Sequence, residues 1–161
     1  MDTRVAPLAE ILRLNTVLFR NCLDGLNDEQ AALRPSGATN SAAFVAAHLT
    51  NSRFYLLGML GAAEKDPLAP YLDGRKSLDE LERLPALVEI HAAWTQAAHL
   101  LRDRLASLTA AELDGPSSAR FPLANGTLLG TLTFLVQHDS YHIGQLSLLR
   151  KYCGLPAMRY Q

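Results

Sequence analysis

Apolar residues recur along most of the chain at spacings of three and four positions, which is typical of amphipathic helices. This pattern predicts four long helices, over 7–24, 41–62, 77–108 and 127–154. Pro85 falls inside the third of these, so we expect a kink or a fresh start at that point. No alternating pattern long enough for a strand is present.

Polar segments mark the connections between these helices. "LNDEQAALRP" and "LASLTAAELDGP" each contain a capping residue, Asn27 or Thr109, then a short acidic turn and a proline. Ser77 with Glu80 forms a further capping-box pattern at the start of the third helix. The sequence therefore predicts an all-α four-helix bundle with long crossover connections and short extra helices, in a single domain over 1–161.

The periodicity also predicts which side chains face the core. The inward stripe of the first helix is Leu8, Ile11, Leu12, Asn15, Leu18, Phe19 and Cys22. The inward stripe of the third helix is Leu84, Leu87, Val88, Trp94, Ala98 and Leu101, and His91 lies on this stripe. That of the last helix is Leu128, Leu132, Leu135, His138, His142, Leu146 and Leu149.

Composition narrows the function classes. Hydrophobic residues make up 48% of the chain and charged residues 19%, a balance that excludes a disordered chain or a coiled coil. The 15 basic and 16 acidic residues are scattered, so we expect no nucleic-acid or membrane partner. Cys22 and Cys153 form neither a disulfide framework nor a thiolate zinc motif. With no signal peptide or membrane-length apolar run, we expect a cytoplasmic protein.

Two imidazoles one helical turn apart on an apolar stripe, His138 and His142, are the arrangement that a metal ion can bind with two bonds. The segment "HDSYH" differs from the H-E-x-x-H of zinc proteases, because Asp139 replaces the glutamate and no ligand type follows downstream. A di-iron site would need two E-x-x-H motifs, which the chain lacks. A third ligand must come from upstream.

Three upstream histidines are candidates for that third ligand. His99 has mainly polar neighbours on the helix surface and is expected to be solvated. His48 and His91 both lie on helices that enter the core, and periodicity does not separate them. A core histidine without function is the alternative interpretation for either one.

The segments "AAFVAAHLTNSRFYLLGML" and "LTFLVQHDSYHIGQLSLLRKYCGLP" resemble the two signature helices of the DinB/YfiT-like superfamily of metal-dependent enzymes. This resemblance implies an up-down-down-up four-helix bundle, often dimeric, with a three-histidine metal site. Transferred to this chain, the ligands are His48, His138 and His142. Many relatives carry a tryptophan before the first ligand helix, where this chain has no aromatic residue before Phe44, so the nearby pocket is expected to differ.

Three neutral imidazoles leave a divalent ion such as Zn, Ni or Fe with an open position for water or a thiolate. Asp139 points about 100° away from His138 on the helix, so we expect it only to orient a ligand or to pair on the surface. Tyr55, Asn51 and Gln145 are the polar candidates for placing a substrate.

Without an evident general base, the sequence favours an enzyme acting on a small molecule by transfer of a low-molecular-weight thiol. A metal-dependent hydrolase and a non-catalytic metal-binding or interaction bundle are the alternatives. No catalytic residue is assigned.

A second apolar line on the last helix is Phe134, Tyr141, Leu148 and Tyr152. These residues are expected either to form a homodimer interface or to pack against a neighbouring helix of the same bundle.

Overall fold

The computed structural model describes residues 2–72, 77–123 and 125–160, and the regular secondary structure of these residues is helical. The four long helices are α1 (Ala6–Leu23), α3 (Ala42–Met59), α5 (Leu87–Ser107) and α7 (Leu128–Tyr152). The short elements are α2 (Asp28–Ala32), α4 (Ala69–Leu72), the 3₁₀ turn η1 (Leu78–Glu80) and α6 (Ala110–Asp114). In this part of the chain, extended backbone pairs as an isolated bridge between Pro116 and Thr127.

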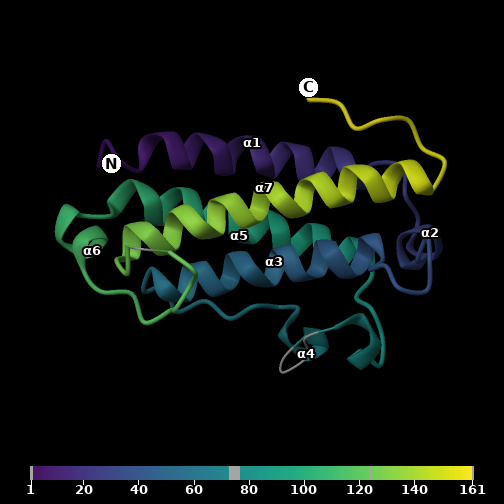
Figure 1. Cartoon of the computed structure of the whole chain (residues 1–161), viewed down its shortest axis with the longest axis horizontal. Helices are drawn as coiled ribbons and strands as arrows, with labels where there is room; N and C mark the ends of the chain where they lie inside the picture. Colours follow the sequence, from purple (N-terminus) through teal and green to yellow (C-terminus); the bar gives the residue numbers. More distant parts are fainter. Residues whose placement is uncertain (1, 73–76, 124, 161) are drawn as a thin grey trace.

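The four long helices lie side by side, with both connections that carry α2 and α6 at the ends of the molecule (Figure 1). α1 contacts α7 and α5, and α3 contacts the same two helices from the other side. Each long helix therefore has two long neighbours, and the apolar faces meet in one core of Leu, Ala, Phe and Trp side chains. No helix among the described residues is long and apolar enough to cross a membrane.

Side-chain caps fix where several helices begin. Asn27 accepts a hydrogen bond from the Gln30 backbone and completes a capping box at α2, and Thr109 does the same with Glu112 at α6. Thr127 caps α7 through the backbone N–H of Gly130. α7 ends before Gly154, whose φ of +79° leaves the helical region. The caps predicted at Asn27 and Thr109 are therefore confirmed, and so is the start of the last helix at Thr127.

The third long helix begins ten residues later than the prediction from Ser77, because the chain makes only the 3₁₀ turn η1 there. Pro85 precedes a fresh start at Leu87. The Leu87 backbone N–H donates to the Asp28 carboxylate of α2 at 2.7 Å, and the Ala86 N–H donates to the Glu89 carboxylate at 2.9 Å. The tertiary contact with α2 therefore supplies a cap that local sequence could not reveal.

Two residues placed on inward stripes by periodicity lie outside the core. Ile11 of α1 is 40% exposed and Val88 of α5 is 74% exposed. The stripe that faces the core is narrower than a helical wheel suggests, and these two assignments are wrong.

Candidate metal centre

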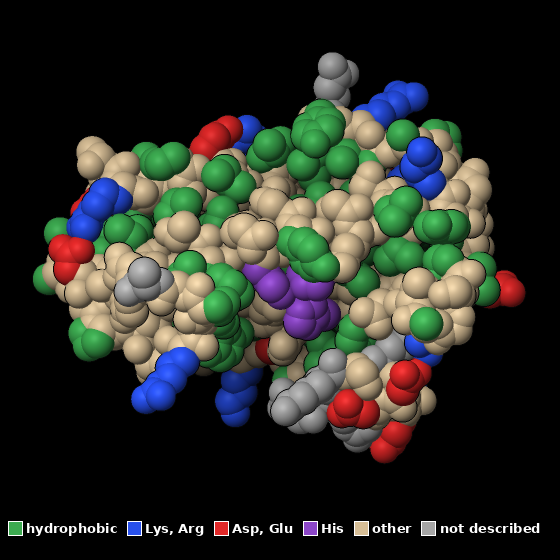
Figure 2. All heavy atoms as spheres, viewed as in Figure 1, with side chains coloured by type: hydrophobic (Ala, Val, Ile, Leu, Met, Phe, Trp, Pro, Cys, Tyr) green, Lys and Arg blue, Asp and Glu red, His purple; other side chains and the backbone are tan. Residues whose placement is uncertain are grey.

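Three histidines meet where α3 lies against α7. His48 comes from α3, while His138 and His142 stand one turn apart on α7. All three are half-buried, and the space-filling view shows histidine side chains gathered near the middle of the face formed by these helices, with hydrophobic side chains beside them (Figure 2). The packing of α3 on α7 thus brings together residues that are far apart in the sequence.

The nitrogen atoms of these rings point at one another. His138 Nε2 lies 3.0 Å from His142 Nε2 and 3.3 Å from His48 Nε2. The ligand atoms of all three lie within 4.8 Å of one another. Three ring nitrogens that converge in this way need either shared protons or a cation between them.

Hydrogen bonding fixes the proton on one of the rings. His142 Nδ1 lies 2.7 Å from the Gln145 side-chain oxygen, which can only accept, so His142 carries its proton on Nδ1 and presents the lone pair of Nε2 to the cluster. His138 Nδ1 is buried and has no hydrogen-bond partner among the described residues. Buried polar atoms without partners are rare in folded proteins.

Burial keeps these imidazoles neutral. It lowers the pKa of His48 to about 4, with a further contribution from His142. Burial likewise lowers the pKa of His138 to about 4, helped by repulsion from His142 and His48. The pKa of His142 is also lowered by burial, although the bond to Gln145 and the charge of Asp139 oppose the shift. Neutral imidazole is the form that binds metal.

The donor set fits a divalent transition metal. A tetrahedral ion with zinc–nitrogen bonds of about 2.0–2.1 Å holds its ligand nitrogens roughly 3.3–3.4 Å apart, close to the spacings of the Nε2 atoms. The cluster offers three neutral nitrogens and no fourth protein ligand of its kind among the described residues. The three histidines could therefore hold a metal ion and leave a position for another ligand.

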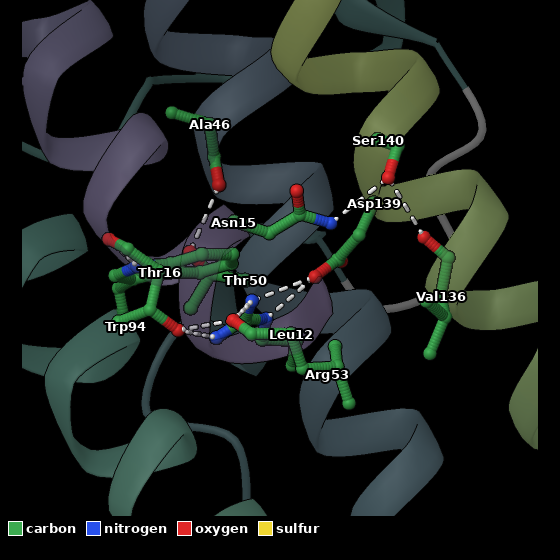
Figure 3. A network of polar contacts seen from close by, with 10 residues as sticks. All are labelled: Leu12, Asn15, Thr16, Ala46, Thr50, Arg53, Trp94, Val136, Asp139 and Ser140. Atoms are coloured by element: carbon green, nitrogen blue, oxygen red, sulfur yellow. Dashed lines mark hydrogen bonds and ion pairs between the residues drawn. The ribbon is translucent and has the colours of Figure 1, made fainter. Parts of the chain in front are cut away.

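Asp139, next to His138, turns away from the cluster into the core. Its Oδ2 accepts hydrogen bonds from Arg53 Nη2 at 2.7 Å and Nε at 2.9 Å, and the two side chains are only 2% and 3% exposed (Figure 3). The expected surface pairing of Asp139 is therefore wrong, because the partner is a buried cation. No hydrogen bond joins Asp139 to a histidine ring among the described contacts.

The buried guanidinium of Arg53 also contacts residues of α1 and α5. Its Nη1 donates to Thr16 at 2.8 Å and its Nη2 to the Leu12 carbonyl at 3.2 Å, both on α1. The Trp94 ring of α5 lies 3.5 Å below its central carbon. Arg53 thus links α3 to the other three long helices, directly behind the histidine cluster.

The remaining histidines lie elsewhere. His91 is half-buried on α5, where its ring meets the edge of Phe19 at a centroid distance of 6.3 Å. His99 is exposed, as expected. Neither belongs to the group of converging ligand atoms. The cysteines are free, and burial raises the pKa of Cys22 to about 11, which suits an inert core thiol.

The three polar residues expected to place a substrate differ in what they contact. Gln145 binds His142 directly. Asn51 donates to the Asp66 carboxylate at 2.7 Å, so its amide is engaged by the segment after α3. Tyr55 is 48% exposed and touches Phe121 edge to face. Of the three, Tyr55 keeps the largest exposed fraction of its side chain.

A separate cavity of about 440 Å³ lies between α1 and α5. Its polar lining residues are Glu10, Arg13, Thr16, Arg53, His99 and Arg102. It contains none of the three clustered histidines, and its two rim arginines are paired with Glu10 and Asp103. The converging donor atoms therefore mark the α3–α7 face, not this cavity, as the candidate site.

Comparison with known proteins gives the family of the chain and agrees with its fold. The family model of the DinB superfamily matches residues 11–146, so this chain belongs to the DinB superfamily. A crystal structure described as a conserved protein from Enterococcus faecalis is similar with a TM-score of 0.73. The match covers 94% of this chain and 97% of that one at 14% identity, which shows a shared fold. The comparison with curated proteins gives no match.

Sequence reasoning missed Arg53 and Phe121. Arg53 is the only charged residue in α3, and a lone charge in a helix with twelve buried residues was a signal for a buried partner. Phe121 lies in the connection before α7, where no periodicity applies, and its position against Phe134 follows only from the tertiary structure.

Proposed function

We propose that this protein is a metal-dependent enzyme that acts on a small molecule, with a divalent transition metal held by His48, His138 and His142. The observation that carries the proposal is the convergence of three Nε2 atoms, at 3.0 and 3.3 Å from the central one. A bound metal would supply an open coordination position at which a thiol is held as thiolate or a water is activated.

The chain's own residues support a nucleophile held at that position. Gln145 orients His142 by accepting a hydrogen bond from its Nδ1–H. Burial keeps the imidazoles unprotonated, so their lone pairs are available at neutral pH. Half-exposed rings leave the cluster open toward solvent on the α3–α7 face.

Transfer of a low-molecular-weight thiol is favoured over hydrolysis. A hydrolase needs a general base beside the water, and Asp139, the only acid of α7, is directed into the core by Arg53. A thiol held by the metal as thiolate would need no such base: a free thiol of pKa ~8.5 is mostly protonated near neutral pH, and coordination to the metal would lower that pKa so that the proton is released to solvent. Hydrolysis remains the alternative reaction, and a non-catalytic metal-binding bundle the alternative role.

The first test measures metal content. The purified protein should carry about one divalent transition metal per chain, and His48→Ala, His138→Ala and His142→Ala should each lose most of it. His99→Ala is the matched control and should keep full occupancy. Normal occupancy in His48→Ala would contradict the ligand set.

The second test uses protein loaded with Co²⁺, whose visible absorption reports on its ligands. Small thiols should change the spectrum, and thiol-dependent conversion of an electrophile should disappear in His142→Ala. Turnover of simple esters or amides with no response to thiols would favour hydrolysis. Metal binding without any turnover would favour the non-catalytic role.

We also infer the connectivity and the assembly expected for this superfamily. The order of neighbours, α1 beside α7 and α3 beside α5, supports an up-down-down-up bundle. Tyr141, Leu148 and Tyr152 are 58%, 55% and 66% exposed on α7, which supports a homodimer through this helix. Phe134 is excluded from that surface, because it packs against Phe121 in the same chain.

Sedimentation at micromolar concentration tests the dimer. Twice the monomer mass of 17.6 kDa is expected, and Leu148→Glu should shift the protein to monomer. A monomeric wild type would contradict the assembly.

A further inference from the structure

A row of aromatic rings leads along the α3–α7 face to the histidine cluster. The ring of Phe121 stacks on Phe134 at a centroid distance of 4.3 Å and meets Tyr55 at 6.5 Å. Phe134 in turn lies 6.4 Å from the ring of His138. These separations fall in the range of contacting aromatic pairs.

Helical spacing explains why the rings point the same way as the histidines. Phe134 precedes His138 by four positions on α7, and Tyr55 follows His48 by seven on α3. Both spacings return a side chain to the same face of its helix. The two helices therefore present Tyr55 and Phe134 on the face that carries the histidines, and Phe121 contacts both rings.

The connection that carries Phe121 is fixed against α7. Ser117 N donates to the Gly126 carbonyl at 2.8 Å, Leu128 N donates to the Gly115 carbonyl at 2.9 Å, and Thr131 donates to the Ser117 hydroxyl at 2.6 Å. A Cβ on Gly130 would overlap the Asn125 carbonyl oxygen, so the connection touches the first turn of α7 directly. Phe121 is thus held at its place by the base of its own loop.

The exposure of these rings leaves surface for a ligand to cover. Tyr55 is 48% exposed, and Phe121 and Phe134 are half-buried. The charged residues of the two helices are elsewhere, since Arg53 and Asp139 pair in the core and Arg150 and Lys151 lie in the last turn of α7. A ligand part that lies on this row would meet apolar ring surface and no charged side chain of these two helices.

We propose that Tyr55, Phe121 and Phe134 form an apolar subsite that receives an aromatic or bulky apolar group of a molecule bound at the three-histidine site. The inference rests on the proposed function and names the substrate class of that site. The group that coordinates at the cluster is small and polar, and the body attached to it is uncharged and flat enough to lie on the Phe121 ring.

The test compares imidazole with 4-phenylimidazole as ligands of the Co²⁺-loaded protein, because both coordinate through the same nitrogen and differ only in the ring. The wild type should bind 4-phenylimidazole the more tightly. Phe121→Ala and Tyr55→Ala should each reduce that preference about three- to ten-fold, the size of one lost aromatic contact. Binding of imidazole itself should not change.

Tyr160→Ala is the matched control, because Tyr160 is a 71% exposed aromatic residue in the C-terminal segment. It should keep the wild-type preference. An unchanged preference in both Phe121→Ala and Tyr55→Ala, with imidazole still bound, would overturn the subsite and leave the proposed metal-dependent function standing.

A measurement on metal-free protein tests the aromatic subsite independently of metal binding. Saturation transfer from the protein to the phenyl protons of 4-phenylimidazole should be seen in the wild type and in Tyr160→Ala, and should weaken strongly in Phe121→Ala. This result is expected even if the protein binds no metal. Failure to bind metal would contradict the proposed function and leave the subsite standing. Equal transfer in all three proteins, or none, would overturn the subsite.

Discussion

Arg53 of α3 and Asp139 of α7 form a buried ion pair, with Nη2 and Oδ2 2.7 Å apart and both side chains nearly inaccessible to solvent. Each residue lies within five positions of a clustered histidine, His48 on α3 and His138 on α7. The pair therefore joins the two helices from the core side, where the histidines meet on the outer side. Burial opposes the charges: it lowers the pKa of Arg53 and raises that of Asp139, and the ion pair counteracts both shifts.

Removing one member of this pair should destabilise the protein strongly. Asp139→Leu leaves the Arg53 guanidinium buried without its counter-ion, so we expect a loss of about 3–5 kcal/mol in the free energy of unfolding. The double variant Arg53→Met/Asp139→Leu removes both charges and should lose less than Asp139→Leu alone. Urea denaturation measures both. If the double variant loses as much free energy of unfolding as Arg53→Met and Asp139→Leu lose together as single variants, the two residues act independently.

The stability of the metal-free protein should fall as the pH drops below neutrality. Histidine in the unfolded chain has a pKa of ~6.5, whereas His48 and His138 in the folded chain have a pKa of about 4. Between these values the unfolded state binds more protons, so stability is full above pH ~6.5 and is lost progressively toward pH ~4. Thermal denaturation in a chelating buffer measures this.

Two variants identify which histidines cause that pH dependence. His48→Asn removes one titrating group and should make the loss between neutrality and pH ~4 shallower. His99→Asn changes an exposed histidine and should leave the profile as in the wild type. A profile that is the same in all three proteins would assign the pH dependence to other groups.

Gln145 should matter for metal affinity although it is not a ligand. Gln145→Leu removes the acceptor that holds the His142 ring and its proton, and losses of about 10–100-fold in metal affinity are usual for such partners. Gln137→Leu is the control, because Gln137 is exposed on the same helix. Competition with a chromophoric chelator measures both affinities. Equal affinities would mean that the bond to Gln145 does not hold the ring.

The cap of α6 should contribute measurably to stability. Thr109 accepts from the Glu112 backbone N–H at 3.3 Å, and its own N–H donates to the Glu112 carboxylate at 2.8 Å. Thr109→Ala should cost about 1 kcal/mol in the free energy of unfolding. Thr133→Ala, in the exposed interior of α7, should cost little, since alanine is the better helix former. Chemical denaturation compares the two.

The sequence by itself determined the helices and most of their limits. Periodicity located the four long helices, because an apolar face repeats with the helical turn wherever a helix packs on a core. Capping residues such as Asn27 and Thr127 are local signals, so they could be found without the fold. Spacing also put His138 and His142 on one face, since that relation lies within a single helix.

Only the tertiary structure decided which distant residues meet. The start of α5 depends on Asp28, a residue of another helix, and the burial of Asp139 depends on Arg53. Periodicity could not choose between His48 and His91; the resemblance to the superfamily favoured His48, and the packing of α3 against α7 brings that residue to the cluster. Contacts between helices depend on how their faces pack, and one sequence read along its length carries no direct record of that packing.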